Sequence, residues 1–163
     1  MNYPRSTLAV AMLLGLSLPG CWPGGAAKHT GLVVVNVLDE PLYNDCRIAS
    51  SINVSLDEID LIEGKIEKNA EVIVYCSNTL CTASGFARDR MRTIGFANVR
   101  AYEPGTAGWY QAGLPTEGPC QQGYLTMKMG SAESDQSTPD TISTQELAER
   151  LGVAPMAPTQ AQQ

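Results

Sequence analysis

Histidine is almost absent from this chain: His29 is the single one among 163 residues. Serine-type catalytic triads need a histidine beside the nucleophile, and zinc sites commonly combine histidine with cysteine. His29 lies upstream of the apolar pattern of the domain, so it does not support a triad. Cys76 and Cys81 have the wrong spacing for a paired-cysteine zinc site. We therefore expect no metal and no other cofactor.

Positive charge and long hydrophobic runs are also scarce. There are 11 Lys and Arg residues against 17 Asp and Glu residues, which gives a formal net charge of −6 at pH 7. Nucleic acids and anionic lipid surfaces attract basic proteins, so this balance argues against both as partners. The apolar run Leu8–Leu18 is too short to span a bilayer as a helix.

The start of the chain has the organisation of a signal peptide. Arg5 is the only charged residue before the apolar run, and the following Leu18-Pro-Gly-Cys21 resembles a bacterial lipobox, in which the cysteine is lipidated and becomes the new N-terminus. The pattern predicts a lipoprotein-type signal peptide over residues 1–20 and lipidation of Cys21. The alternative is an ordinary secretory signal that is cleaved nearby. Both interpretations predict export.

Cleavage would leave a protein that is held at the membrane by its lipid alone. Residues 21–29 predict a short tether between membrane and domain. Loss of residues 1–20 would remove Arg5 and change the net charge to −7. We expect the protein on the periplasmic face of a bacterial membrane. Trp22, rather than an aspartate, follows Cys21, which resembles outer-membrane sorting if the source is Gram-negative.

The rest of the chain is organised around a strand, a cysteine loop and a helix. Val72–Tyr75 is a short run rich in β-branched residues, which predicts a buried strand that ends at Cys76. A helix is expected from Thr82 to the stop at Gly95. Its predicted apolar face consists of Ala83, Phe86, Ala87, Met91 and Ile94. Because N–H groups at a helix N-terminus stabilise anions, we expect Cys76 to be a nucleophilic thiolate.

Strands and helices alternate on both sides of this unit, which predicts a single α/β domain with a mainly parallel sheet flanked by helices. In such sheets ligands bind beyond the carboxyl ends of the strands, where Cys76 lies. Further strands are expected at Leu32–Leu38, Ile52–Val54 and Val99–Tyr102. Two further helices are expected, one after Ser55 and one at Ala107–Gln111. Ser55 and Glu58 would form a capping box at the start of the first.

Several segments in this order resemble rhodanese-like sulfurtransferases. The likeness extends over residues 30–118, which we expect to form a rhodanese-like domain. The segments that carry it are Val33–Tyr43, Arg47–Glu58, the loop from Cys76, Gly95–Val99, Tyr102–Trp109 and Ala112–Pro115.

The resemblance implies a chemistry for this loop. Cys76 would attack the sulfane sulfur of a small donor, thiosulfate or a persulfide, and would carry that sulfur as a persulfide to a thiol or cyanide acceptor. The resemblance also implies that the N–H groups of an active-site loop stabilise the thiolate and the bound anion. That loop consists of Ser77, Asn78, Thr79, Leu80, Cys81 and Thr82.

Cys81 departs from the family pattern, because many members have an arginine at this position. An arginine would provide a fixed cation for an anionic donor, and Cys81 cannot. Cys81 is either a resolving thiol for Cys76 or a small residue that fills the loop. Two alternative functions therefore stay open: an exported thiol/disulfide module that uses both cysteines, and a non-catalytic, membrane-tethered binding domain.

The remaining cysteines and the tail are less informative. Cys46, Cys76, Cys81 and Cys120 could form two disulfides with three possible connectivities in an oxidising compartment. We expect Cys46 to pack beneath the sheet, and the sequence assigns no role to Cys120. Residues 119–163 predict a mostly disordered tail. A short helix is possible near residues 143–151, with Ser143 and Glu146 as a capping box and Gly152 as its stop.

Overall fold

The structure, a computed structural model, describes residues 28–127 and 135–156. The predicted signal peptide, the lipidation site Cys21 and most of the tether lie outside these residues. In chain order the elements are β1 (Leu32–Asn36), α1 (Glu40–Asp45), β2 (Arg47–Ile48), β3 (Ile52–Asn53), the 3₁₀-helix η1 (Leu56–Gly64), β4 (Glu71–Tyr75), α2 (Ala83–Thr93), β5 (Asn98–Tyr102), α3 (Gly105–Gln111), β6 (Thr116–Glu117), the 3₁₀-helix η2 (Gly123–Thr126) and α4 (Thr144–Leu151).

The central sheet has four parallel strands in the order β3-β1-β4-β5. The register pairs Asn36 with Tyr75 and Tyr75 with Tyr102, so that the carboxyl ends of β1, β4 and β5 meet at one edge. The predicted parallel α/β class is confirmed. The short apolar runs made this prediction possible, because strands that are buried on both faces need apolar residues at nearly every position.

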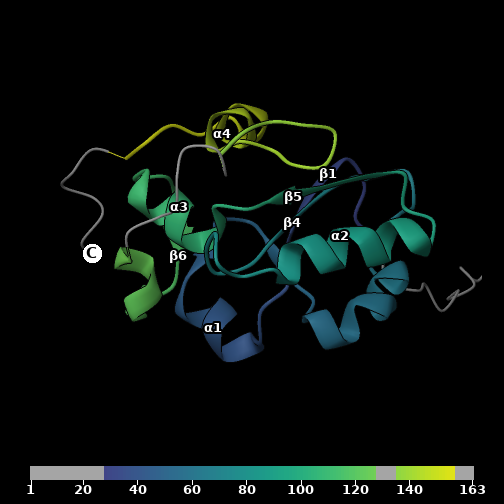
Figure 1. Cartoon of the computed structure of the whole chain (residues 1–163), viewed down its shortest axis with the longest axis horizontal. Helices are drawn as coiled ribbons and strands as arrows, with labels where there is room; N and C mark the ends of the chain where they lie inside the picture. The colour runs from purple at the N-terminus through teal and green to yellow at the C-terminus, as the bar shows by residue number, and fades with distance from the viewer. Residues whose placement is uncertain (1–27, 128–134, 157–163) are drawn as a thin grey trace, which may run out of the picture.

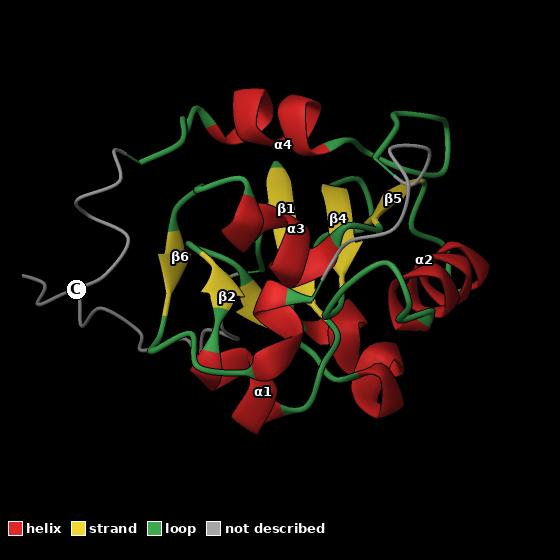
Figure 2. Ribbon diagram, turned by 60° about the vertical axis from the view of Figure 1, so that its left-hand side comes forward, coloured by secondary structure: helices red, strands yellow, loops and turns green. Residues whose placement is uncertain are grey.

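Helices cover both faces of this sheet, with α2 on one side and α4 on the other (Figure 1). Successive side chains of a strand point to opposite faces, so Val33 and Val35 pack on the side of α2 and η1 while Val34 packs on the side of α3 and α4. Alternate residues of the same strands therefore contribute to two core layers, one on each face of the sheet. Figure 2 shows the sheet strands between these helices.

Two local expectations on the α2 side were wrong. Phe86 does not belong to the buried face of α2: its exposed fraction is 65 %, whereas Ala87, Met91 and Ser84 are buried. The segment after Ser55 is a 3₁₀-helix, and the Ser55 side chain makes no capping hydrogen bond. Among the described residues, no helix combines the length and the apolar character needed to cross a membrane.

The expectation of a mostly disordered tail was wrong for residues 119–127 and 135–156. A backbone bridge joins this segment to β5, where the Ala101 N–H donates to the Asp140 carbonyl (2.8 Å) and the Ile142 N–H donates to the Ala101 carbonyl (3.0 Å). The tail thereby becomes part of the domain. Residues 128–134 and 157–163 lie outside the described residues.

The short helix expected near residues 143–151 is present as α4, with the Ser143 side chain accepting from the Glu146 N–H and with Gly152 in a left-handed conformation at its end. Ile142 and Leu147 are fully buried against the sheet. The guanidinium of Arg100 on β5 also forms an ion pair with Glu146 at 2.8 Å. Residues that follow the expected domain thus cover part of one face of the parallel sheet, beside α3.

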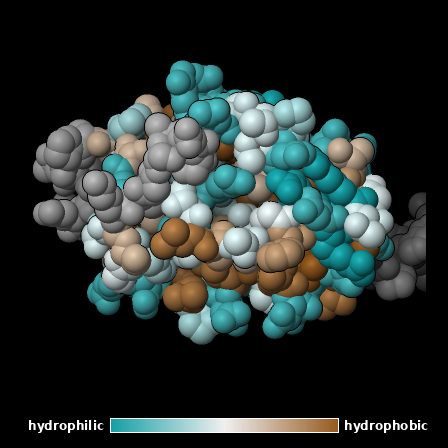
Figure 3. Space-filling view, viewed as in Figure 1, coloured by the Kyte–Doolittle hydropathy of each residue, from teal (hydrophilic) through white to brown (hydrophobic). Residues whose placement is uncertain are grey.

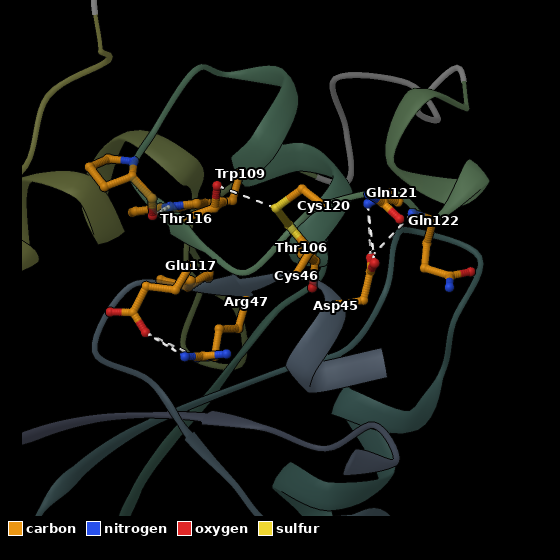
Figure 4. Close-up of a disulfide and its surroundings, with 12 residues drawn as sticks. Asp45, Cys46, Arg47, Thr106, Trp109, Thr116, Glu117, Cys120, Gln121 and Gln122 are labelled. Carbon is orange, nitrogen blue, oxygen red and sulfur yellow. Dashed lines mark hydrogen bonds and ion pairs between the residues drawn. A yellow bond between two sulfur atoms is a disulfide. The ribbon is translucent and has the colours of Figure 1, made fainter. Parts of the chain in front are cut away.

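A disulfide joins Cys46 to Cys120, a pairing that the sequence left open, and Cys46 is buried (Figure 4). The disulfide lies beside the small antiparallel sheet of β2 and β6. An ion pair between Arg47 and Glu117, at 2.9 Å, joins the two strands of that sheet. Backbone contacts add to the connection, because the Cys120 N–H donates to the Asp45 carbonyl at 2.8 Å. The segment after β6 is therefore fixed against the end of α1.

Candidate active site

The cysteine loop lies at the carboxyl edge of the sheet, between β4 and α2. Cys76 follows Tyr75 directly, and the loop is held by the turn that begins α3. The Thr106 N–H donates to the Cys76 carbonyl and the Ala107 N–H donates to the Ser77 carbonyl, each at 2.9 Å. These bonds fix the start of the loop to a neighbouring strand-to-helix turn, so Cys76 has a defined position at the end of the central strand.

Gly105 makes this close approach possible. It has φ +62°, and a Cβ at this position would lie 2.6 Å from the Cys76 carbonyl oxygen and 2.8 Å from the Asn78 nitrogen. Both atoms belong to the backbone and cannot rotate away. Only glycine combines this left-handed conformation with this contact at low cost.

Asn78 organises the middle of the loop. Its side-chain oxygen accepts from the Leu80 N–H at 3.0 Å, and its carbonyl accepts from the Cys81 N–H at 3.0 Å. These two N–H groups, which the sequence assigned to anion binding, therefore have partners within the loop. Asn78 is buried and Ser77 and Thr79 are half-buried, whereas Leu80 and Thr82 are exposed.

Cys76 is a free cysteine whose side chain is fully buried. Its thiol donates to the Cys81 carbonyl oxygen at 3.1 Å, and its sulfur lies 3.6 Å from the Ser84 hydroxyl oxygen. The hydrogen bond with the Cys81 side chain, and then burial, raise the pKa of the Cys76 thiol well above its ordinary value. Burial and the facing carbonyl oxygen thus favour the protonated form of Cys76, and the expected thiolate at this residue stays a prediction.

Cys81 is the second free cysteine, and it has the opposite surroundings. Its pKa is lowered, first by the hydrogen bond from the Cys76 thiol and then, against the effect of burial, by the N–H groups of Ala83 and Ser77. The Ser77 side chain contributes in the same direction. Cys81 stands just before Thr82, the N-cap of α2, and N–H groups and the helix dipole favour an anion near this end of the helix. These contacts favour an anion on Cys81.

The comparisons with known proteins agree with this geometry. The sequence profile of the rhodanese-like domain matches residues 25–112, which is more than half of the chain. The chain belongs to the rhodanese-like domain family. Among curated proteins no sequence matches it.

The solved structures show the same rhodanese-like fold, and 19 of their chains match. The BH2092 protein of Bacillus halodurans is 25% identical with a TM-score of 0.53, and the alignment covers 65% of this chain and 77% of that one. The Alr3790 protein of Anabaena sp. is 26% identical with a TM-score of 0.51, and the alignment covers 55% of this chain and 70% of that one.

Two residues beside the rhodanese-like loop were missed by the sequence analysis. Ser84 is buried in the first turn of α2 and lies against Cys76, and its polar type at a buried helical position was an available signal. Tyr124 comes from η2, beyond the residues that match the family. Its hydroxyl is buried and has no hydrogen-bond partner among the described residues, and burial raises its pKa. No sequence pattern placed Tyr124 near the site.

Two large apolar side chains are exposed at the loop and at the start of α2. Leu80 in the loop and Phe86 in α2 have exposed fractions of 77 % and 65 %. Figure 3 shows hydrophobic residues gathered in the lower half of the face that carries α1 and α2. Within the described residues there is no group of three side chains that could hold a metal ion. The reactive groups of this site are therefore its two thiols and the polar groups around them.

Proposed function

We propose that this protein is a sulfurtransferase that carries sulfane sulfur as a persulfide on Cys76. The supporting observation is a free cysteine at the carboxyl end of the central strand, at the start of the strand-to-helix loop of a rhodanese-like domain. The donor would be thiosulfate or a small persulfide, and the acceptor a thiol or cyanide.

The chemistry would proceed in two displacements. In the first, a thiolate of the site attacks the sulfane sulfur, and sulfite or a thiol leaves. In the second, the acceptor attacks the outer sulfur of the persulfide and regenerates the cysteine. The burial of Cys76 supports its role as the carrier, because a persulfide there would be shielded from water and from unintended acceptors.

We further propose that the protein is exported and held at the periplasmic face of a bacterial membrane through lipid on Cys21, at the outer membrane if the source is Gram-negative. The disulfide between Cys46 and Cys120 supports export, because stable disulfides are typical of oxidising compartments.

A thiol/disulfide module is the second candidate function. It is favoured by the presence of two free cysteines in one loop, where the sulfur of Cys76 lies 3.1 Å from the carbonyl oxygen of Cys81. Such a module would exchange electrons with a partner dithiol and would carry no sulfur.

A transfer assay separates these candidates. The purified protein is mixed with thiosulfate or with a low-molecular-weight persulfide and with cyanide, and thiocyanate is measured. We expect formation of thiocyanate above the uncatalysed rate, and loss of that excess in the Cys76→Ser/Cys81→Ser double variant. A protein that forms no thiocyanate with either donor contradicts the proposal. In that case a Cys76–Cys81 disulfide under mild oxidation would favour the redox module, and its absence a binding domain.

A further inference from the structure

The position of the two thiols points to a division of labour, which rests on the proposed function. We propose that Cys81 is the nucleophile that takes sulfur from the donor, and that Cys76 then receives this sulfur from Cys81 and stores it. The loop would be a two-thiol relay rather than a site with one reactive cysteine.

Access to the two sulfur atoms differs. Cys76 has no exposed surface, whereas Cys81 is partly exposed. A donor that approaches from solvent therefore meets Cys81 first. The loop is also anchored at its start and in its middle by the bonds of Thr106 and Asn78, so Cys76 cannot reach solvent without a change in these contacts.

The polar groups around each sulfur support the same order. N–H groups of Ser77 and Ala83 face the sulfur of Cys81, and such donors stabilise a thiolate. The nearest acceptor of the Cys76 thiol is a carbonyl oxygen, at 3.1 Å, which stabilises the protonated form. The lowered pKa of Cys81 and the raised pKa of Cys76 agree with these contacts. One of the N–H groups that were expected to bind a donor anion, that of Ser77, thus faces the Cys81 sulfur.

The relay balances in atoms and electrons. First the Cys81 thiolate attacks the sulfane sulfur of thiosulfate, a new sulfur–sulfur bond forms on Cys81, and sulfite leaves with the electron pair of the broken bond. Cys76 then attacks the outer sulfur of this persulfide. The bond from that sulfur to Cys81 breaks, and the thiol proton of Cys76 passes to the Cys81 sulfur. Cys76 now carries the persulfide, and Cys81 ionises again. No oxidant or reductant is consumed.

The sequence between the two cysteines allows their sulfur loads to be distinguished. Cleavage after Tyr75, Leu80 and Phe86 places Cys76 and Cys81 on separate peptides. The full-length protein is incubated with thiosulfate, samples are alkylated and acidified at successive times, and the peptides are analysed by mass spectrometry. Leu61→Ala serves as the surface control, since its side chain is exposed on η1.

In the relay, added sulfur is found on Cys81 before Cys76, and Cys76→Ser traps it on Cys81. Cys81→Ser slows the loading of Cys76 by about tenfold or more, because Cys76 is buried and its thiol faces the Cys81 carbonyl oxygen. Equal loading rates of Cys76 in Cys81→Ser and in Leu61→Ala would overturn the relay and leave the proposed function intact. Absence of sulfur from Cys81 in Cys76→Ser would overturn it independently of how Cys81→Ser folds. Absence of added sulfur from both cysteines of the natural protein would instead overturn the proposed function.

Discussion

At the scale of single residues, the account depends on two cysteines whose surroundings oppose each other. Cys76 occupies the position that the sequence identifies, but its thiol faces acceptors and has no contact with solvent. Cys81 stands next to the start of α2, where N–H donors gather. The sequence could place both residues in one loop. It could not tell which sulfur would face N–H groups and which a carbonyl, since this depends on the path of a few loop residues.

The first prediction concerns alkylation at mildly acidic pH. A lowered pKa keeps Cys81 ionised below the usual range of thiols, and this reactivity is lost only as the pH falls through its pKa in the folded protein. At pH 6, iodoacetamide should therefore modify Cys81 while Cys76 stays largely unmodified, as measured by peptide mass spectrometry. The Cys81→Ser variant is the control and should react slowly under the same conditions. Preferential labelling of Cys76 would contradict the assignment of the thiolate.

At the scale of secondary-structure elements, the sequence predicted the parallel strands and the two helices with clear stop signals. Short β-branched runs define β1 and β4, and glycines follow α2 and α4. Helical periodicity failed at Phe86, because the buried face of α2 is formed by Ser84, Ala87 and Met91 and does not include it. The position of the turn before α3 was not predictable either, since it depends on contacts between loops that are distant in sequence.

A pair of glycine substitutions tests how the turn before α3 holds the loop. Gly105→Ala should lower the free energy of unfolding by more than about 2 kcal/mol, because it combines a left-handed conformation with a backbone clash at Cys76. Gly85→Ala in α2 is the matched control, since its Cβ would meet no atom within 4 Å. That change should raise the free energy of unfolding by about 0.5–1 kcal/mol. Denaturant unfolding measures both, and similar stabilities of the two variants would argue against this packing.

A further prediction concerns α4, which the sequence left as an optional helix. Leu147 is fully buried against the sheet, so Leu147→Ala should lower the free energy of unfolding by about 2–5 kcal/mol. Leu61→Ala removes the same atoms from an exposed position and should change it by less than about 0.5 kcal/mol. Equal effects in thermal or denaturant unfolding would mean that α4 does not form part of the core.

At the scale of the whole molecule, the domain is larger than the segment that carries the family resemblance. Residues beyond the matched range provide the disulfide partner Cys120, the buried Tyr124 hydroxyl and the helix α4. Sequence patterns could not reveal these long-range contacts. The spacing of cysteines does not determine which of them form a disulfide. A polar segment within a folded domain can have the same composition as a disordered tail.

The disulfide should make a large contribution to the stability of the whole domain. It closes a loop between residues 74 positions apart, so the Cys46→Ser/Cys120→Ser double variant should lose about 2–5 kcal/mol of unfolding free energy without reductant. Denaturant unfolding with a reductant is the control, and the two proteins should then have similar stabilities. An unchanged stability under oxidising conditions would contradict the structural role of this disulfide.

The central claim is that sulfane sulfur is stored on Cys76, and the most direct measurement is the mass of the Cys76 peptide after incubation with thiosulfate or a small persulfide. The account predicts one added sulfur atom on this peptide at the end of loading, which cyanide removes and which the Cys76→Ser protein cannot hold at residue 76. A Cys76 peptide without added sulfur, in a protein that is folded and has both loop thiols reduced, would contradict it.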